Sequence, residues 1–236
     1  MTATGSPAEL AFTEAALPSG STPWREVDFT VIDLETTGLD PGRDEIISFA
    51  TVSVRGGRIT LADARYELVR PNRMPSSETI RIHGLREADL VDAPPLSALI
   101  DDLLEVLTGR ALVAHVASVE GGFLDAALSA HGLELRNPMV DTAELDRELR
   151  SLRRDPAGKD PIALSEMARD LGLPVHRPHH ADGDALTTAQ AFIALATHLE
   201  AFRPQTLRTL AQFSLHRGRK PLSLRELLHR FVFRHA

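Results

Sequence analysis

Two carboxylates one residue apart end the first strongly apolar stretch of the chain. Asp33 and Glu35 close a run that begins at Phe29, and its β-branched and apolar residues are typical of a strand. Alternate residues of a strand share a face, so both carboxylates project to the same side. Carboxylates this close repel each other unless a positive charge lies between them. The pair therefore predicts a site for a hard divalent cation, with an ordinary polar turn after the strand as the alternative.

Three later stretches place polar residues where strands and helices are expected to meet. The stretch His115-Val-Ala-Ser-Val-Glu120 leads from an apolar run into a helix. The stretch His179-His-Ala-Asp-Gly-Asp184 begins the longest expected helix, and Asp141 precedes another. Acids in a first helical turn are favoured by the helix dipole and by capping, so each stretch alone has a structural explanation. For Asp141 we expect that role of helix N-cap.

Taken in order, these motifs resemble the DEDD superfamily of 3′→5′ exonucleases, in particular its histidine-containing, DnaQ-like subclass. The resemblance extends over residues 28–199. The runs Glu35-Thr-Thr-Gly-Leu39, Ile82-His-Gly-Leu85 and Val140-Asp-Thr142 are closer to the proofreading epsilon subunit of bacterial DNA polymerase than to oligoribonuclease. The resemblance implies hydrolysis of phosphodiester bonds at 3′ ends of single-stranded DNA, in proofreading or repair trimming, with a DNA polymerase as partner. RNA or short oligonucleotides are the alternative substrates.

The resemblance also implies two divalent cations, Mg²⁺ or Mn²⁺, as cofactors. Asp33 would bridge both ions, Glu35 and Asp184 would complete the first, and Glu120 would serve the second, directly or through water. Phosphodiester hydrolysis requires neutralised phosphate charge, an activated water and a stabilised leaving oxygen, and two metals supply all three.

The resemblance assigns His179 as the general base that takes a proton from the attacking water. His180 and His176 have the same chemistry, but only His179 has the family spacing His-x-Ala-x-x-Asp-Ala. Asp182 likewise lies at the wrong distance along the chain to replace Asp184.

Substrate contacts are expected in the turn after the first acid pair. By resemblance, the backbone of Thr36 and Thr37 would meet the terminal 3′ hydroxyl, and Leu39 would pack against the last base. His83 lies in a loop that is near the substrate in relatives, with a solvent-facing turn residue as the alternative.

One motif departs from the family pattern. The family usually has Asn where this chain has Val116, and Phe-Asp where it has Val119-Glu120. Glutamate keeps the charge but moves the carboxylate by one methylene, which affects the second metal. Glu120 therefore keeps open a rival function, a non-catalytic module of the same fold that binds nucleic acid or a polymerase.

The periodicity of apolar residues predicts the elements that position these motifs. Residues 71–95 are expected to be mostly loop, and Gly56-Gly57 to form a hairpin turn. The expected strands are residues 27–34, 45–54, 58–69, 111–115 and 138–141, and the expected helices are residues 96–107, 120–131, 142–153, 164–171 and 181–202. This order predicts an α/β fold with a five-stranded mixed sheet, an antiparallel meander plus parallel strands, flanked by helices. The family fold, RNase H-like, is of this kind.

Composition divides the chain into three parts. Residues 1–24 are rich in small residues and proline without a period and are expected to be a disordered leader, followed by an exonuclease domain over residues 25–202. Residues 203–236 are expected to form a basic helical extension, because residues 201–236 carry eight basic residues against one acid in a chain of net charge −7. That extension either packs on the acidic body or serves as a clamp for nucleic acid or a docking helix.

The same composition bears on compartment. The 236 residues contain no cysteine, which excludes disulfides and thiolate metal sites. No apolar run reaches the length of a membrane span, and residues 1–24 lack the pattern of a signal peptide. We therefore expect a soluble, cytoplasmic protein without a membrane partner.

Overall fold

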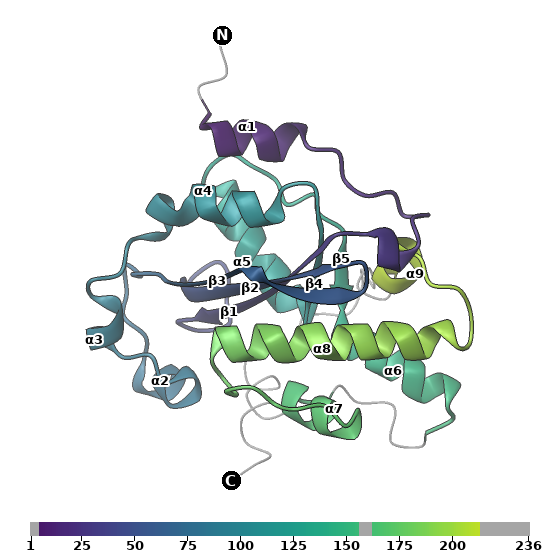
Figure 1. Ribbon diagram of the computed structural model, residues 1–236. Helices are drawn as coiled ribbons and strands as arrows, with labels where there is room; N and C mark the ends of the chain where they lie inside the picture. Colours follow the sequence, from purple (N-terminus) through teal and green to yellow (C-terminus); the bar gives the residue numbers. More distant parts are fainter. Residues whose placement is uncertain (1–4, 156–161, 213–236) are drawn as a thin grey trace.

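A five-stranded mixed sheet forms the centre of the computed structural model, which describes residues 5–155 and 162–212 (Figure 1). The strand order is β3-β2-β1-β4-β5. The strands are β1 (Phe29–Thr36), β2 (Ile46–Arg55), β3 (Arg58–Leu68), β4 (Ala111–Ala114) and β5 (Met139–Asp141). Strands β1, β2 and β3 are antiparallel neighbours, whereas β4 pairs in parallel with both β1 and β5. The predicted α/β fold, an antiparallel meander joined to parallel strands, is confirmed.

Helices cover both faces of this sheet (Figure 1). On one face, α8 (Ala181–Glu200) packs against β1 and β2, and the ring centroids of its Phe192 and of Phe29 lie 4.8 Å apart. This layer contains α6 (Thr142–Leu152), α7 (Leu164–Asp170), α8 (Ala181–Glu200) and α9 (Leu207–Ala211). The other layer contains α1 (Pro7–Glu14), α4 (Leu96–Leu107) and α5 (Ala117–Ser129). The described helices are each too short or too polar to span a bilayer.

Parallel pairing determines where several of the predicted site residues lie. Because β1, β4 and β5 run in the same direction, their carboxyl ends meet at one edge of the sheet. Asp33 lies in the second half of β1, His115 directly follows β4, and Asp141 ends β5. Strand β1 continues to Thr36, two residues beyond its expected end, so Glu35 lies within the strand, directly before an irregularity in its pairing with β2.

Residues 71–95, expected to be mostly loop, contain two short helices. These are α2 (Ser77–His83) and α3 (Glu87–Leu90). Ser76 accepts a hydrogen bond from Thr79 N–H at the start of α2, and Gly84 ends it in the left-handed conformation. Neither helix was predicted, because four prolines and many polar residues in this stretch obscured the capping signals. Helix α5 also begins at Ala117, three residues earlier than expected.

The expected disordered leader is wrong for residues 7–14. Ser6 and Glu9 form a capping box, in which Ser6 Oγ accepts from Glu9 N–H and Glu9 Oε2 accepts from Ser6 N–H. Helix α1 packs on α4, and Phe12 is only 4% exposed. Between α1 and β1, a 3-10 turn covers Trp24–Glu26. Two isolated buried aromatic residues, Phe12 and Trp24, give too weak a periodic signal within a low-complexity stretch for sequence reasoning.

The packed body continues past residue 202, where the exonuclease domain was expected to end. Leu207 and Leu210 of α9 are buried in the core layer of α8. The predicted basic extension otherwise falls at residues 213–236, outside the described residues, so its helix remains a prediction.

Helix α1 provides a test of this corrected N-terminal region. We expect Phe12→Ala to lower the free energy of unfolding by about 3 kcal/mol, the usual cost of removing a buried phenyl ring. Leu10→Ala is the matched control, because Leu10 lies on the same helix and is 39% exposed. Urea denaturation of the three proteins measures the difference, and equal midpoints for Phe12→Ala and the parent would show that α1 is not part of the folded body.

Candidate active site

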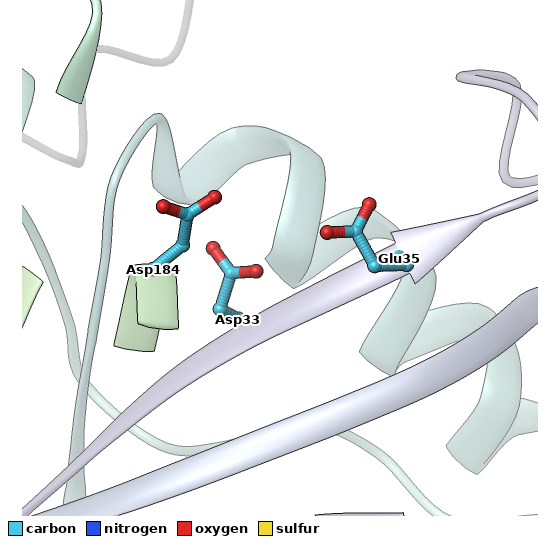
Figure 2. Close-up of side chains that lie close together, drawn as sticks. All are labelled: Asp33, Glu35 and Asp184. Atoms are coloured by element: carbon cyan, nitrogen blue, oxygen red, sulfur yellow. The ribbon is translucent and has the colours of Figure 1, made fainter. Parts of the chain in front are cut away.

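Three carboxylates converge at the edge of the sheet. One oxygen each from Asp33, Glu35 and Asp184 lies within 4.8 Å of the other two. Figure 2 shows the three side chains pointing to the same side, with Asp33 between Asp184 and Glu35. Asp33 and Glu35 come from β1, and Asp184 from the first turn of α8. Within residues 5–155 and 162–212, this is the only group of three or more acidic or histidine side chains close enough together to share one metal ion, and Glu120 lies outside it.

The three carboxylates carry unbalanced charge. Burial, followed by the charges of Glu35 and Asp184, raises the pKa of Asp33 well above its usual value. Burial and then Asp184 and Glu120 raise the pKa of Glu35 in the same way. The pKa of Asp184 is raised to about 7 by burial, against the hydrogen bond from His179 N–H. None of the three forms an ion pair with any residue that the structure describes.

A fourth carboxylate, that of Glu120, faces this cluster from the first turn of α5. Glu120 is 8% exposed, and its Oε2 has no hydrogen-bond partner among the described residues. Burial and then the charge of Asp33 raise its pKa well above the usual value. A buried carboxylate oxygen without a partner is costly unless a cation completes it. Four carboxylates and no thiolate form an all-oxygen donor set that fits Mg²⁺ or Mn²⁺.

His179 lies beside the cluster in a constrained loop. Its backbone is left-handed, with φ of 61°, and its N–H donates to Asp184 Oδ2 at 2.9 Å. The loop rests on Gly183, where a Cβ atom would lie 2.3 Å from the carbonyl oxygen of His176. A larger residue at position 183 would therefore displace the loop that carries His179. Partial burial, and then His180, lower the pKa of His179.

The structure separates His179 from its chemical rivals. His179 lines the cleft above the carboxylates, whereas His176 and His180 do not. His176 N–H donates to Thr187 Oγ1, and His180 is the N-cap residue of α8. Asp182 forms an ion pair with Arg177 at 2.7 Å and does not line the cleft.

The cleft above the carboxylates has a volume of about 450 Å³. The expected substrate residues Thr36, Thr37, Leu39 and His83 all line it. Residues that sequence reasoning missed also line it, namely Ser76, Glu78, Thr79 and Ile82 beside or on α2 and Ala163, Leu164 and Ser165 at the start of α7. The residues beside or on α2 were missed because that helix was not expected.

Two expected substrate residues differ from expectation in detail. Thr37 N–H already donates to the carbonyl oxygen of Glu45 at 2.9 Å, so it is not free for a 3′ hydroxyl. His83 is 3% exposed, which excludes a solvent-facing turn residue. Its Nδ1 accepts from Leu85 N–H, and its Nε2 is buried without a partner among the described residues. Burial and then His180 lower the pKa of His83 to about 4, so the ring is neutral at pH 7.

Burial of the acids, together with their mutual repulsion, predicts how stability depends on pH. The folded pKa values of these acids exceed the unfolded ones, so the metal-free folded protein binds more protons than the unfolded chain. The stability that the acids contribute is complete below about pH 4, and it is lost as pH rises through the folded values, about 7 for Asp184. We expect Asp33→Asn to raise the melting temperature of metal-free protein at pH 8 by several degrees, where about 2–4 °C corresponds to 1 kcal/mol.

Thermal denaturation in chelator at pH 5 and pH 8 measures this effect. The gain from Asp33→Asn should shrink at pH 5, and Asp125→Asn, an exposed position on α5, is the matched control. If the Asp33→Asn protein melts at or below the melting temperature of the parent at pH 8, the ionised Asp33 carboxylate does not destabilise the metal-free fold.

Comparison with known proteins places this chain in a family. The family model described as "Exonuclease" matches residues 30–192. The chain is 33% identical over 169 residues to a PolC-type DNA polymerase III of Thermotoga maritima, covering 71% of this chain and 12% of the relative. It is 30% identical over 190 residues to the 3′-5′ exonuclease DinG of Bacillus subtilis, covering 80% and 20%. It is 30% identical over 172 residues to DNA polymerase III subunit epsilon of Aquifex aeolicus, covering 72% and 81%.

Solved structures agree with this placement. The fold resembles Exonuclease X in complex with 5′ overhanging duplex DNA, with a TM-score of 0.61, 25% identity, and 79% and 99% of the two chains covered. E. coli Exonuclease I in complex with a dT13 oligonucleotide, at 15% identity, matches in fold with a TM-score of 0.66 over 75% and 42% of the two chains. The chain spans an eighth to a fifth of the length of the first two curated relatives. By its sequence match, its RNase H-like sheet and its structural neighbours, the chain belongs to the RNase T-type exonuclease family.

Proposed function

We propose that this protein is a divalent-metal-dependent 3′→5′ exonuclease that removes nucleotides from the 3′ ends of single-stranded DNA. The observation that carries the proposal is the group of carboxylates of Asp33, Glu35 and Asp184 in a cleft, with Glu120 facing them. None of the three forms an ion pair with a residue that the structure describes. Uncompensated charge of this kind costs stability and is retained where function requires it. The family membership supports the same reaction class.

The carboxylates would divide two metal sites between them. Asp33, Glu35 and Asp184 would hold one ion, and Asp33 and Glu120 the other. When bound, Mg²⁺ or Mn²⁺ would neutralise phosphate charge and favour ionisation of the attacking water. The raised pKa values of the acids mean that protons must leave as metal binds, so affinity should increase with pH.

His179 would accept the proton from the attacking water. Its lowered pKa keeps the ring neutral, and therefore able to act as a base, near pH 7. The hydrogen bond from its N–H to Asp184 Oδ2 ties the loop position to one of the proposed ligands. The base and the metal site would thus be positioned by the same start of α8.

The cleft walls would hold the 3′ end of the substrate. Thr36 keeps the role expected for the backbone beside the 3′ hydroxyl, since the N–H of Thr37 is engaged. Leu39 would pack against the terminal base, and the Nε2–H of buried His83 would donate to a substrate acceptor. The likeness to Exonuclease X, solved with overhanging duplex DNA, favours DNA over RNA. Epsilon and PolC-type relatives support a DNA polymerase as partner.

Digestion of labelled oligonucleotides tests this function. The full chain is incubated with 5′-labelled single-stranded DNA or RNA of the same sequence, with Mg²⁺, Mn²⁺ or chelator. We expect a ladder shortened from the 3′ end, faster on DNA, and no reaction in chelator. Faster RNA digestion would reassign the substrate. No release with either metal would overturn the enzyme in favour of a binding module of the same fold.

Substitution of the histidines tests the proposed base. We expect His179→Ala to lower turnover by about two to four orders of magnitude, the usual contribution of general-base catalysis, without loss of the fold. His180→Ala is the matched control and should cost far less, because His180 does not line the cleft. Single-turnover digestion of single-stranded DNA measures both variants. The reverse ranking would show that His180 is the base.

A further inference from the structure

The connection between β4 and α5 contains a residue in a costly conformation. Val116 has φ of 63° and ψ of 53°, which is the left-handed region. A β-branched side chain in that region costs on the order of 1–2 kcal/mol and persists only where surrounding contacts enforce it. Val116 is the N-cap residue of α5 and offers no side-chain hydrogen bond to the helix. The start of α5 must therefore be held by another part of the chain.

The carboxylate of Asp141, at the end of the neighbouring strand β5, fixes the start of α5. Its Oδ1 accepts from Val116 N–H at 3.1 Å, and its Oδ2 accepts from Ala117 N–H at 3.0 Å. Oδ1 also accepts from Ala143 N–H at 2.9 Å, the predicted N-cap contact for α6, which is confirmed. Asp141 is 7% exposed, so these hydrogen bonds are protected from water. One carboxylate thus fixes the starts of two helices.

The helix start held by Asp141 carries Glu120. Glu120 lies three residues after Ala117, within the first turn of α5. No described residue donates a hydrogen bond to Glu120 Oε2, so that atom has no side-chain partner to orient it. Its position relative to Asp33 therefore depends on where the backbone of α5 begins and in which direction the helix runs.

We propose that Asp141 is a positioning residue for Glu120: by clamping the turn at Val116, it directs the first turn of α5 so that Glu120 reaches the second metal position. This inference rests on the proposed metal-dependent function. Both oxygens of Asp141 are occupied by backbone donors, so Asp141 acts through the helix rather than as a metal ligand. The longer glutamate side chain makes this support more necessary, because it has an additional torsion to restrain.

Two substitutions separate the roles of Asp141. Asp141→Ser keeps a good N-cap for α6, but its single, shorter hydroxyl cannot also accept from Val116 and Ala117. Asp141→Asn keeps one acceptor oxygen and turns an amide N–H₂ toward one of the backbone donors. Thr206→Ala is the control for cap loss, because Thr206 caps α9 and does not line the cleft.

The test is a double-mutant cycle on Mn²⁺ affinity, measured by calorimetry on metal-free protein without substrate. The cycle compares the parent, Asp141→Ser, Glu120→Gln and the double variant. We expect Asp141→Ser to weaken the lower-affinity Mn²⁺ site by about tenfold, the lower end of what outer supports contribute. In the Glu120→Gln background the same change should cost less than about twofold, since the charged ligand that Asp141 would position is gone. Thr206→Ala should leave both affinities unchanged.

The outcomes distinguish this proposal from the proposed function. A loss that persists undiminished in the Glu120→Gln background would come from the missing charge of Asp141 and would overturn the positioning role, as would no loss at all. If the parent protein binds Mn²⁺ but digests no nucleic acid, the proposed exonuclease function is overturned. The double-mutant cycle then still tests whether Asp141 positions Glu120. A parent that binds no Mn²⁺ overturns both. If Asp141→Ser fails to fold, the same cycle is measured with Asp141→Asn. We then expect a smaller loss of Mn²⁺ affinity, which again largely disappears in the Glu120→Gln background.

Discussion

Partial burial and mutual repulsion of the site carboxylates are the constraint on which the rest of this structure depends. Asp33, Glu35 and Asp184 approach within 4.8 Å without a basic partner in the described chain, and Glu120 faces them. Each raises the pKa of another, so the folded state without metal holds protons that the unfolded chain would release. Only a cation of high charge density relieves this arrangement while leaving the carboxylates ionised.

The fold enforces this close approach at several points. Parallel pairing of β4 with β1 and β5 brings the strand ends to one edge, and α8 begins over the same edge. Strained backbone accompanies the site: Val116 and His179 both adopt left-handed conformations that their side chains disfavour. Val116 N–H donates a hydrogen bond to Asp141, and His179 N–H donates one to Asp184. The rigid sheet and its caps thus stabilise a site that the acids alone would disrupt.

Sequence reasoning succeeded where short-range pattern determines structure. The leucine spacing of residues 96–107 predicted α4 with its observed bounds, and the acid pair in a β-branched run placed Asp33 on β1. It failed where structure depends on distant partners or few apolar residues. Helix α1 depends on one buried phenyl ring packed near α4, and α2 on its caps within a proline-containing stretch. The hydrogen bonds of Asp141 to the start of α5 could not be predicted, because the donors, Ala117 and Val116, lie 24 and 25 residues earlier in the chain.

Anomalous diffraction from crystals grown with Mn²⁺ tests the metal-binding role of the carboxylates most directly. Data collected at the manganese edge locate bound ions without reference to activity. The account predicts one strong peak among Asp33, Glu35 and Asp184, and a second, weaker peak between Asp33 and Glu120. A cleft without any manganese peak, at an ion concentration that saturates the protein in solution, would contradict it.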